Sequence, residues 1–371
     1  MKIVCISASQ IPSSTANSIQ AMKACQALAQ LGHELTLLVP GQFAQEDLAR
    51  FYGLRQTFPV AWLAGSRRLF PWRAVRRALQ LKPDLLYVWP LQAALFGLQA
   101  GLPVLLEMHD LPSGRFGPLW YRWFLRARGQ KRLLLITQAL RRALDEAYAE
   151  IFPTVEAIVA PNGVDLERFD SLPDPVAARR QLSLPSAETV LCTGHLYAGR
   201  GADLFLELAR VLPEVHFLWV GGRAQEVQTW RARAEREHLS NVTFAGFIPN
   251  QELPLYQAAA DVLLMPYGLV IAISSGMGHS ASVASPMKMF EYLAAGRAIV
   301  TSDLPVIREV LNEANAVFCP PEDLAAWQTA VKNLLDNPGW RETLGRQARR
   351  DAEGYTWQSR ARKALEGFPR A

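Results

Sequence analysis

The residues best suited to chemistry lie in the stretch from Ser285 to Gly296, which reads SPMKMFEYLAAG. The pattern predicts a helix with Ser285 as its N-cap, Pro286 at its first position and Gly296 just past its end. Lys288 would lie in the first turn, where the helix dipole disfavours a cation unless an anion binds there. Glu291, one turn later, could accept hydrogen bonds from hydroxyl groups of the same ligand. The alternative is an ordinary surface helix that carries one Lys and one Glu.

A second candidate anion site is the loop at residues 194–201, GHLYAGRG, between an expected strand at 189–193 and an expected helix. Its glycines would let backbone N–H groups approach a phosphate, and Arg200 could form two hydrogen bonds with it. The next expected strand ends in Gly221 and Gly222, which we expect near the same ligand. Glycine turns are common, so this loop alone is weak support for a nucleotide site.

A third group of polar residues lies at the end of the expected strand at 104–107. Glu107 closes this strand, and His109 and Asp110 follow it. Ligands of α/β proteins bind at the carboxyl ends of the strands, so His109 is a candidate catalytic residue. A single histidine is more often structural than catalytic, and both interpretations stay open. Glu107 and Asp110 would then orient the loop or its histidine.

Residues 285–300, SPMKMFEYLAAGRAIV, resemble the donor-binding segment of the retaining glycosyltransferases of family GT4, which have the GT-B fold. The resemblance implies that Glu291 binds the ribose of a sugar nucleotide. Family members often have a second Glu eight residues earlier, where this chain has Val283. The resemblance also implies that the helix start receives the donor diphosphate, at Ser285, Pro286, Met287 and Lys288.

The resemblance continues in order along nearly the whole chain. Family members usually present an Arg and a Lys to the diphosphate from the loop matched by residues 194–201. The corresponding residues here are His195 and Arg200. The loop that contains His109 is similar to the family loop whose histidine faces the donor sugar. The resemblance therefore implies catalytic roles for His109, Arg200 and Lys288, and further donor contacts at Gly194, His195, Gly221 and Gly222.

The activity implied by the resemblance is transfer of a sugar from a UDP- or GDP-sugar to an acceptor hydroxyl, with retention at the anomeric carbon. The chain contains no D-x-D triplet, so we expect no essential metal, and we expect no cofactor. The acceptor could be lipid-linked, a saccharide or a small molecule. Neither the base, the sugar nor the acceptor follows from the sequence.

Other functions were weighed on the same residues. A dinucleotide-binding enzyme would carry G-x-G-x-x-G in the first loop, but residues 12–17 read PSSTAN and contain no glycine. A nucleotide-sugar epimerase has the same fold and the same need to bind a diphosphate, and product analysis would distinguish it. A non-enzymatic sugar-binding protein is a further alternative. Nothing surrounding the basic segments resembles a nucleic-acid-binding module.

The elements that would position these residues read as alternating strands and helices. Short continuous apolar runs are typical of a buried parallel sheet, and they fall at 2–6, 35–39, 85–88, 104–107, 133–137 and 157–160. The linker candidate is the Pro- and Gly-containing segment at 160–169. We predict an α/β GT-B fold in which two Rossmann-like domains face each other across a cleft.

The first predicted domain comprises residues 1–163 and a C-terminal helix at 355–371 that crosses back to it. The second comprises residues 164–354. The aperiodic segment at 267–284 would form a lid or a wall of the acceptor site.

Charge is distributed unevenly in this chain of 371 residues. Residues 1–165 contain 18 Lys and Arg against 11 Asp and Glu, whereas the remainder is slightly acidic. The segment from Arg115 to Arg132 mixes arginines with aromatic residues and lacks acids, which suits an anionic membrane surface as well as a core helix with solvated arginines. Four scattered cysteines and the absence of a long apolar run favour a cytoplasmic protein, peripheral on the inner face of the membrane if that segment binds lipid.

Overall fold

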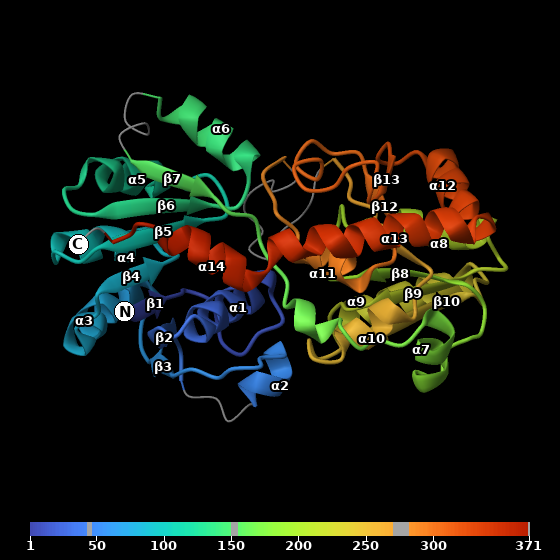
Figure 1. Cartoon of the computed structure of the whole chain (residues 1–371), viewed down its shortest axis with the longest axis horizontal. Helices are drawn as coiled ribbons and strands as arrows, with labels where there is room; N and C mark the ends of the chain where they lie inside the picture. The colour runs from blue at the N-terminus through green and yellow to red at the C-terminus, as the bar shows by residue number, and fades with distance from the viewer. Residues whose placement is uncertain (43–46, 150–154, 270–281, 370–371) are drawn as a thin grey trace. The chain divides into compact units, whose positions relative to one another are not determined.

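The computed structural model describes residues 1–42, 47–149, 155–269 and 282–369 (Figure 1). The chain divides into two compact units. Unit 1 comprises Met1–Asn162, Val283–Ser285 and Trp357–Ala371. Unit 2 comprises Gly163–Ser282 and Pro286–Thr356.

Unit 1 is built on a parallel seven-stranded sheet with the order β3-β2-β1-β4-β5-β6-β7. Its strands are β1 (Lys2–Ile6), β2 (Glu34–Pro40), β3 (Val60–Leu63), β4 (Leu85–Val88), β5 (Val104–Met108), β6 (Lys131–Leu135) and β7 (Glu156–Val159). Strands β4 and β5, in the middle of the sheet, are buried along their whole length, as expected for a parallel sheet covered on both faces.

Two layers of helices cover this sheet. The helices are α1 (Ala16–Gln30), α2 (Leu48–Tyr52), α3 (Phe70–Leu81), α4 (Leu91–Gln99), α5 (Gly117–Arg126), α6 (Gln138–Ala147) and α14 (Trp357–Leu365). One hydrophobic core joins α3, α4, α5 and α6 to the face that carries Leu106. Glu107 points to the opposite face because side chains alternate along a strand, and there it meets α1 and the C-terminal helix α14, which pack on each other.

Unit 2 is built on a parallel six-stranded sheet with the order β10-β9-β8-β11-β12-β13. Its strands are β8 (Thr189–Thr193), β9 (His216–Val220), β10 (Val242–Gly246), β11 (Val262–Met265), β12 (Ala298–Ser302) and β13 (Val317–Cys319). Its helices are α7 (Pro175–Gln181), α8 (Ala202–Val211), α9 (Ala224–Arg236), α10 (Leu253–Ala258), α11 (Met287–Ala295), α12 (Leu324–Asp336) and α13 (Pro338–Ala352). Helices α8, α9 and α12 share one core with the sheet, and α11 packs against α13.

Two parallel sheets, each covered by helices, confirm the predicted α/β class with two Rossmann-like units. The predicted strands are present, although β6 begins at Lys131 rather than 133. Strand β3 was not predicted. It is an edge strand whose residues are all only half-buried, so its sequence lacks the strong apolar run of the central strands. The last helix begins at Trp357, because residues Glu353–Tyr355 form a separate 3-10 turn.

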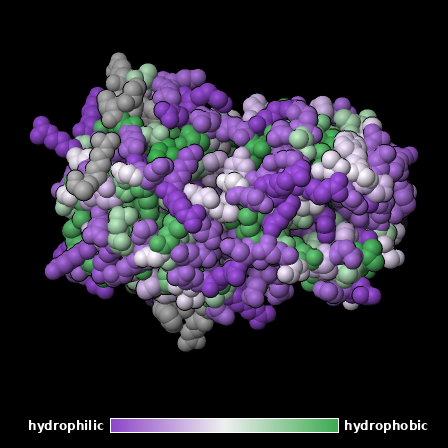
Figure 2. All heavy atoms as spheres, in the orientation of Figure 1, coloured by the Kyte–Doolittle hydropathy of each residue, from purple (hydrophilic) through white to green (hydrophobic). Residues whose placement is uncertain are grey.

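Hydrophilic residues cover most of the face drawn in Figure 2, with hydrophobic residues in separate groups between them. Within the described part of the chain, no helix combines the length and the apolar character needed to cross a membrane.

Candidate functional site

The start of α11 differs from the prediction in one detail. The helix begins at Met287 with Pro286 in the N-cap position, so the prediction that Ser285 caps it is wrong. Ser285 instead accepts two hydrogen bonds from Asn162, one from the backbone N–H to Ser285 Oγ at 3.1 Å and one from the side chain to the Ser285 carbonyl at 2.7 Å. Among the residues that the structure describes, no side chain caps the helix, so its first N–H groups remain suited to an anion. Gly296 ends the helix in the left-handed conformation, as predicted.

Lys288 lies in the first turn of α11, as predicted, and reaches the carboxyl end of β8. Its Nζ donates to the Thr193 carbonyl at 3.1 Å and lies 3.6 Å from Cys192 Sγ. Burial raises the pKa of the Cys192 thiol, although the neighbouring lysine lowers it, so the sulfur stays uncharged at neutral pH. The Lys288 ammonium group therefore has no thiolate to neutralise it. Its Nζ also lies 4.6 Å from the centroid of the Tyr267 ring.

Arg200, from the loop between β8 and α8, meets the same ring. Its Nη1 donates to the Tyr267 hydroxyl at 3.1 Å, and its Cζ lies 5.3 Å from the ring centroid. Its Nε is buried and has no hydrogen-bond partner within the described residues. The structure thus brings Arg200 and Lys288 to one buried tyrosine, and neither forms an ion pair with an acid in the described ranges. Two cations without a carboxylate suit a dianionic ligand such as a diphosphate.

Sequence reasoning placed Tyr267 only at the start of the expected lid at 267–284 and gave it no role of its own. Its position one residue past Pro266, at the carboxyl end of β11, is the signal that could have identified it. The carbonyl of Tyr267 accepts a hydrogen bond from Ser302 Oγ at 2.7 Å, which fixes its backbone to the end of β12. The ring is therefore held in place by two neighbouring strands.

Close backbone approaches in unit 2 require the glycines of this site. Gly201 has φ +85°, and a Cβ there would lie 2.0 Å from the Pro266 carbonyl oxygen. Gly221 has φ +119°, and a Cβ there would lie 2.5 Å from the Gly194 carbonyl oxygen. The first contact places the end of the 194–201 loop against Pro266, and the second places the start of the loop beside the turn formed by Gly221 and Gly222. A bulkier residue at Gly221 would push the two turns apart, and one at Gly201 would push the loop away from Pro266.

Two further predicted site residues of unit 2, His195 and Glu291, contact residues other than Tyr267. The His195 ring stacks on Tyr197, with centroids 4.9 Å apart and planes within 8°, and the Arg223 guanidinium lies 5.5 Å from the Tyr197 centroid. Glu291, on α11, accepts a hydrogen bond from Gln257 Nε2 at 3.3 Å. Its carboxylate is half-buried, and it still belongs to the same helix turn as Lys288.

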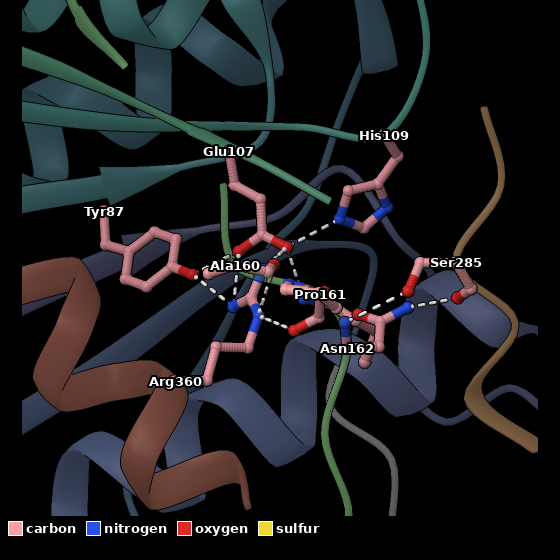
Figure 3. A network of polar contacts seen from close by, with 9 residues as sticks. Tyr87, Glu107, His109, Ala160, Pro161, Asn162, Ser285 and Arg360 are labelled. Atoms are coloured by element: carbon pink, nitrogen blue, oxygen red, sulfur yellow. Dashed lines mark hydrogen bonds and ion pairs between the residues drawn. The ribbon is translucent and has the colours of Figure 1, made fainter. Parts of the chain in front are cut away.

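His109 belongs to unit 1 and follows β5 directly (Figure 3). Its Nε2 lies 2.7 Å from Oε1 of the fully buried Glu107. Burial alone would raise the pKa of Glu107, but Arg360, His109 and Tyr87 outweigh it and lower that pKa to about 2. An ionised carboxylate only accepts hydrogen bonds, so Nε2 of His109 carries the proton and donates it. Asp110 accepts a hydrogen bond from the Leu111 N–H at 2.8 Å and shapes the following turn.

The predicted lid at 267–284 lies largely outside the described residues, which end at 269 and resume at 282. Within the described ranges, no three His, Cys, Asp or Glu side chains gather as a metal site requires. The roles of His109, Arg200, Lys288 and the other donor-site residues stay predictions at this point.

Family models match both halves of the chain. The model described as Glycosyltransferase Family 4 matches residues 19–168, and the model described as Glycosyl transferases group 1 matches residues 187–337. The first match covers most of unit 1, and the second covers most of unit 2, including every donor-site residue predicted there. Arg360 lies beyond both matches.

Curated relatives and solved structures agree with these matches. The D-inositol 3-phosphate glycosyltransferase of Kineococcus radiotolerans is 26% identical over 65% of this chain, a match that spans only 57% of that relative. The GDP-mannose-dependent alpha-(1-6)-phosphatidylinositol dimannoside mannosyltransferase of Mycobacterium tuberculosis is 26% identical over 90% of this chain and 87% of its own length. The structure of Anabaena Alr3699/HepE in complex with UDP has a TM-score of 0.75, with 19% identity over 99% of both chains. Such structural likeness confirms the predicted GT-B fold.

Proposed function

Because the chain belongs to the family 4, group 1 glycosyltransferases, we propose that it transfers a sugar from a nucleoside-diphosphate sugar to an acceptor hydroxyl. The donor is a UDP- or GDP-sugar, and the anomeric configuration is retained. The observation that carries the proposal is the pair of cations, Arg200 and Lys288, held on Tyr267 near the uncapped start of α11.

The site stabilises the diphosphate leaving group. As the bond between the sugar and the diphosphate breaks, negative charge grows on the departing diphosphate. The α11 N–H groups and the two cations are fixed before the reaction, so they stabilise that charge without reorganising. Glu291 binds the ribose from the same helix. The glycines at 194, 221 and 222 leave room for the nucleotide.

Retention without a carboxylate nucleophile on the enzyme favours attack by the acceptor hydroxyl on the face that the diphosphate leaves. The departing phosphate then takes the proton of the attacking hydroxyl. His109 faces the donor sugar and accepts a hydrogen bond from one of its hydroxyl groups through Nδ1. No metal takes part in this scheme, since the cations supply the positive charge. No resident cofactor is needed.

The acceptor is proposed to be lipid-linked, and the surface of α5 supports this. Trp123 of α5 and Phe116, the N-cap residue before it, are about half exposed, and Arg122 and Arg126 of the same helix are exposed. The helix contains no acidic residue. Such a surface favours an anionic membrane. One of the relatives is named for a phosphatidylinositol dimannoside acceptor. A cytoplasmic protein that binds the inner face of the membrane would meet such an acceptor.

Not all basic residues of the segment from Arg115 to Arg132 are available to bind a membrane. Lys131 donates hydrogen bonds to carbonyls at the end of α5, including that of Leu125 at 2.6 Å. Arg132 is buried in β6 and pairs with Glu156 at 2.6 Å. These two residues are structural, so the proposed membrane surface ends at Arg128.

Product analysis tests the reaction type. The protein is incubated with UDP- and GDP-sugars and candidate acceptors, with and without EDTA, and the anomeric configuration of the product is read by NMR. We expect a glycoside with the configuration of the donor, formed equally with EDTA. An inverted product or complete dependence on added Mg²⁺ or Mn²⁺ would contradict the proposal. An epimerised sugar without transfer would identify the epimerase alternative.

A further inference from the structure

A buried polar network in unit 1 joins the C-terminal helix to His109 (Figure 3). Its centre is the ion pair between Arg360 of α14 and Glu107 of β5, with Nη2 and Oε1 2.7 Å apart. The side chains of both residues are at most 5% exposed. Tyr87 of β4 and Gln20 of α1 donate to the same carboxylate.

Every nitrogen of the Arg360 guanidinium has a partner. Nη1 contacts Glu107 Oε2 at 3.2 Å and the Tyr87 hydroxyl at 3.1 Å. Nε donates to the carbonyls of Ala160 at 3.2 Å and Pro161 at 2.9 Å. The next residue, Asn162, holds Ser285, which lies two residues before α11. One guanidinium therefore contacts both the carboxylate beside His109 and the backbone directly before Asn162.

A buried ion pair is weak support for a role in stability, because apolar residues of similar volume are often as stable. This pair has a consequence that apolar residues would not reproduce. The Arg360 charge keeps Glu107 ionised, and an ionised carboxylate can only accept a hydrogen bond, here from the N–H group at His109 Nε2. A neutral acid or amide at position 107 could donate instead, and the proton of the His109 ring would no longer be confined to Nε2.

We propose that Arg360 is a positioning residue for glycosyl transfer, acting through Glu107 to fix His109 with Nε2 protonated and Nδ1 free to accept. The inference rests on the proposed function, in which that Nδ1 accepts a hydroxyl of the donor sugar. It goes beyond that function by giving the C-terminal helix a part in the reaction. Arg360 itself does not touch the donor.

The decisive variant is the double change Glu107→Gln with Arg360→Met. Removing one partner alone would leave a buried, unpaired charge and risk unfolding, whereas the double change leaves none. We expect the folded variant to lose about 10- to 100-fold in kcat, as for a misplaced catalytic group, with an unchanged Kd for UDP or GDP. Arg360→Lys keeps the charge beside Glu107 and should retain more kcat than the double variant.

The matched control is the buried pair Arg179 and Asp261 of unit 2, whose atoms are 2.7 Å apart. The double change Arg179→Met with Asp261→Asn should lower the melting temperature comparably and leave kcat within about twofold, because this pair lies outside the predicted site. Equal kcat losses in both double variants would overturn the proposal, since they would report only the loss of a buried ion pair. So would a wild-type kcat in a folded Glu107→Gln, Arg360→Met variant.

A second readout does not depend on activity. The six histidines are labelled with ¹⁵N, and His109 is assigned with the His109→Asn variant. We expect the neutral ring of the wild type to carry its proton on Nε2, and the Glu107→Gln, Arg360→Met variant to show a mixture of tautomers. A proton on Nδ1 in the wild type, or the same tautomer in both proteins, would overturn the inference. If no donor is turned over but the tautomers behave as expected, the proposed function fails and the positioning role of Arg360 on His109 stands.

Discussion

At the scale of single residues, Tyr267 is the centre of the proposed diphosphate site. Its ring and hydroxyl hold Arg200, and its ring faces the Lys288 ammonium group. Both cations could be proposed from the sequence, because Arg200 lies in a glycine loop between a strand and a helix, and Lys288 lies in the first turn of a helix. Tyr267 could not, because its role depends on which side chains the fold brings to its ring. For the same reason the role of Arg360 could not be predicted, since this residue contacts Glu107 across 253 residues of sequence.

Replacing either cation should slow the reaction strongly. We expect Arg200→Ala and Lys288→Ala each to lower kcat/KM by a factor corresponding to about 2–4 kcal/mol, the usual effect of removing one preorganised donor. The controls are Arg346→Ala and Lys332→Ala, which remove exposed cations from α13 and α12. Steady-state kinetics with a UDP- or GDP-sugar measures both. Near-wild-type rates for both site variants would show that the diphosphate binds elsewhere.

Replacing His109 should separate rate from affinity. Because His109 is proposed to face the sugar, His109→Ala should lower kcat while free UDP or GDP binds as in the wild type. Single-turnover kinetics and calorimetric titration of the nucleotide provide the two quantities. Equal losses in rate and in nucleotide affinity would place His109 at the diphosphate instead of the sugar.

At the scale of helices and strands, the buried central strands were predictable and the edge strand β3 was not. The central strands are continuous apolar runs, whereas β3 is half-buried throughout. Helix α5 was recognised as basic and aromatic, but the sequence could not show that Lys131 and Arg132 turn inward. That outcome depends on the carbonyls at the end of α5 and on Glu156, which contact them in the fold.

The surface of α5 should bind anionic membranes. We expect co-sedimentation with vesicles that contain anionic lipid, weakened by salt because screening shortens to about 8 Å at physiological ionic strength. Arg122→Glu with Arg126→Glu should reduce binding, and Arg346→Glu with Arg350→Glu on α13 is the matched control. Absence of binding at low salt would leave α5 as a solvated surface and favour a soluble acceptor.

His216 should make the stability of unit 2 sensitive to acid. Its Nε2 lies 2.9 Å from Thr243 Oγ1, and burial, with a smaller effect of Arg179, lowers its pKa from 6.5 to about 4. The folded state therefore prefers the neutral ring. The associated stability is complete above pH 6.5 and is lost as the pH falls towards about 4.

Thermal unfolding of the wild type and of His216→Gln between pH 7 and pH 4 measures this effect. The difference in melting temperature between the two proteins should change across that window, with the wild type losing more on acidification. Parallel curves would show that His216 does not have the lowered pKa.

At the scale of the whole molecule, two family models match successive parts of the chain, one in each unit. The alternation of strands and helices made the two-unit architecture predictable, since short apolar runs mark parallel strands. The C-terminal helix was expected to return to the first unit, and α14 does pack on α1. The sequence of this helix alone could not show that Arg360 forms an ion pair with Glu107, because no local pattern specifies that partner.

The central claim is that Arg200 and Lys288 bind the diphosphate of a sugar nucleotide whose sugar is transferred. Its most direct test is nucleoside-diphosphate release from a panel of UDP-, GDP- and ADP-sugars, by the wild type and by Lys288→Ala, with acceptors present. We predict rapid release from one donor class by the wild type. The variant should release the nucleotide more slowly, by a factor that corresponds to an activation free energy about 2–4 kcal/mol higher. Equal release by both proteins, or release from none of the donors, would contradict the account.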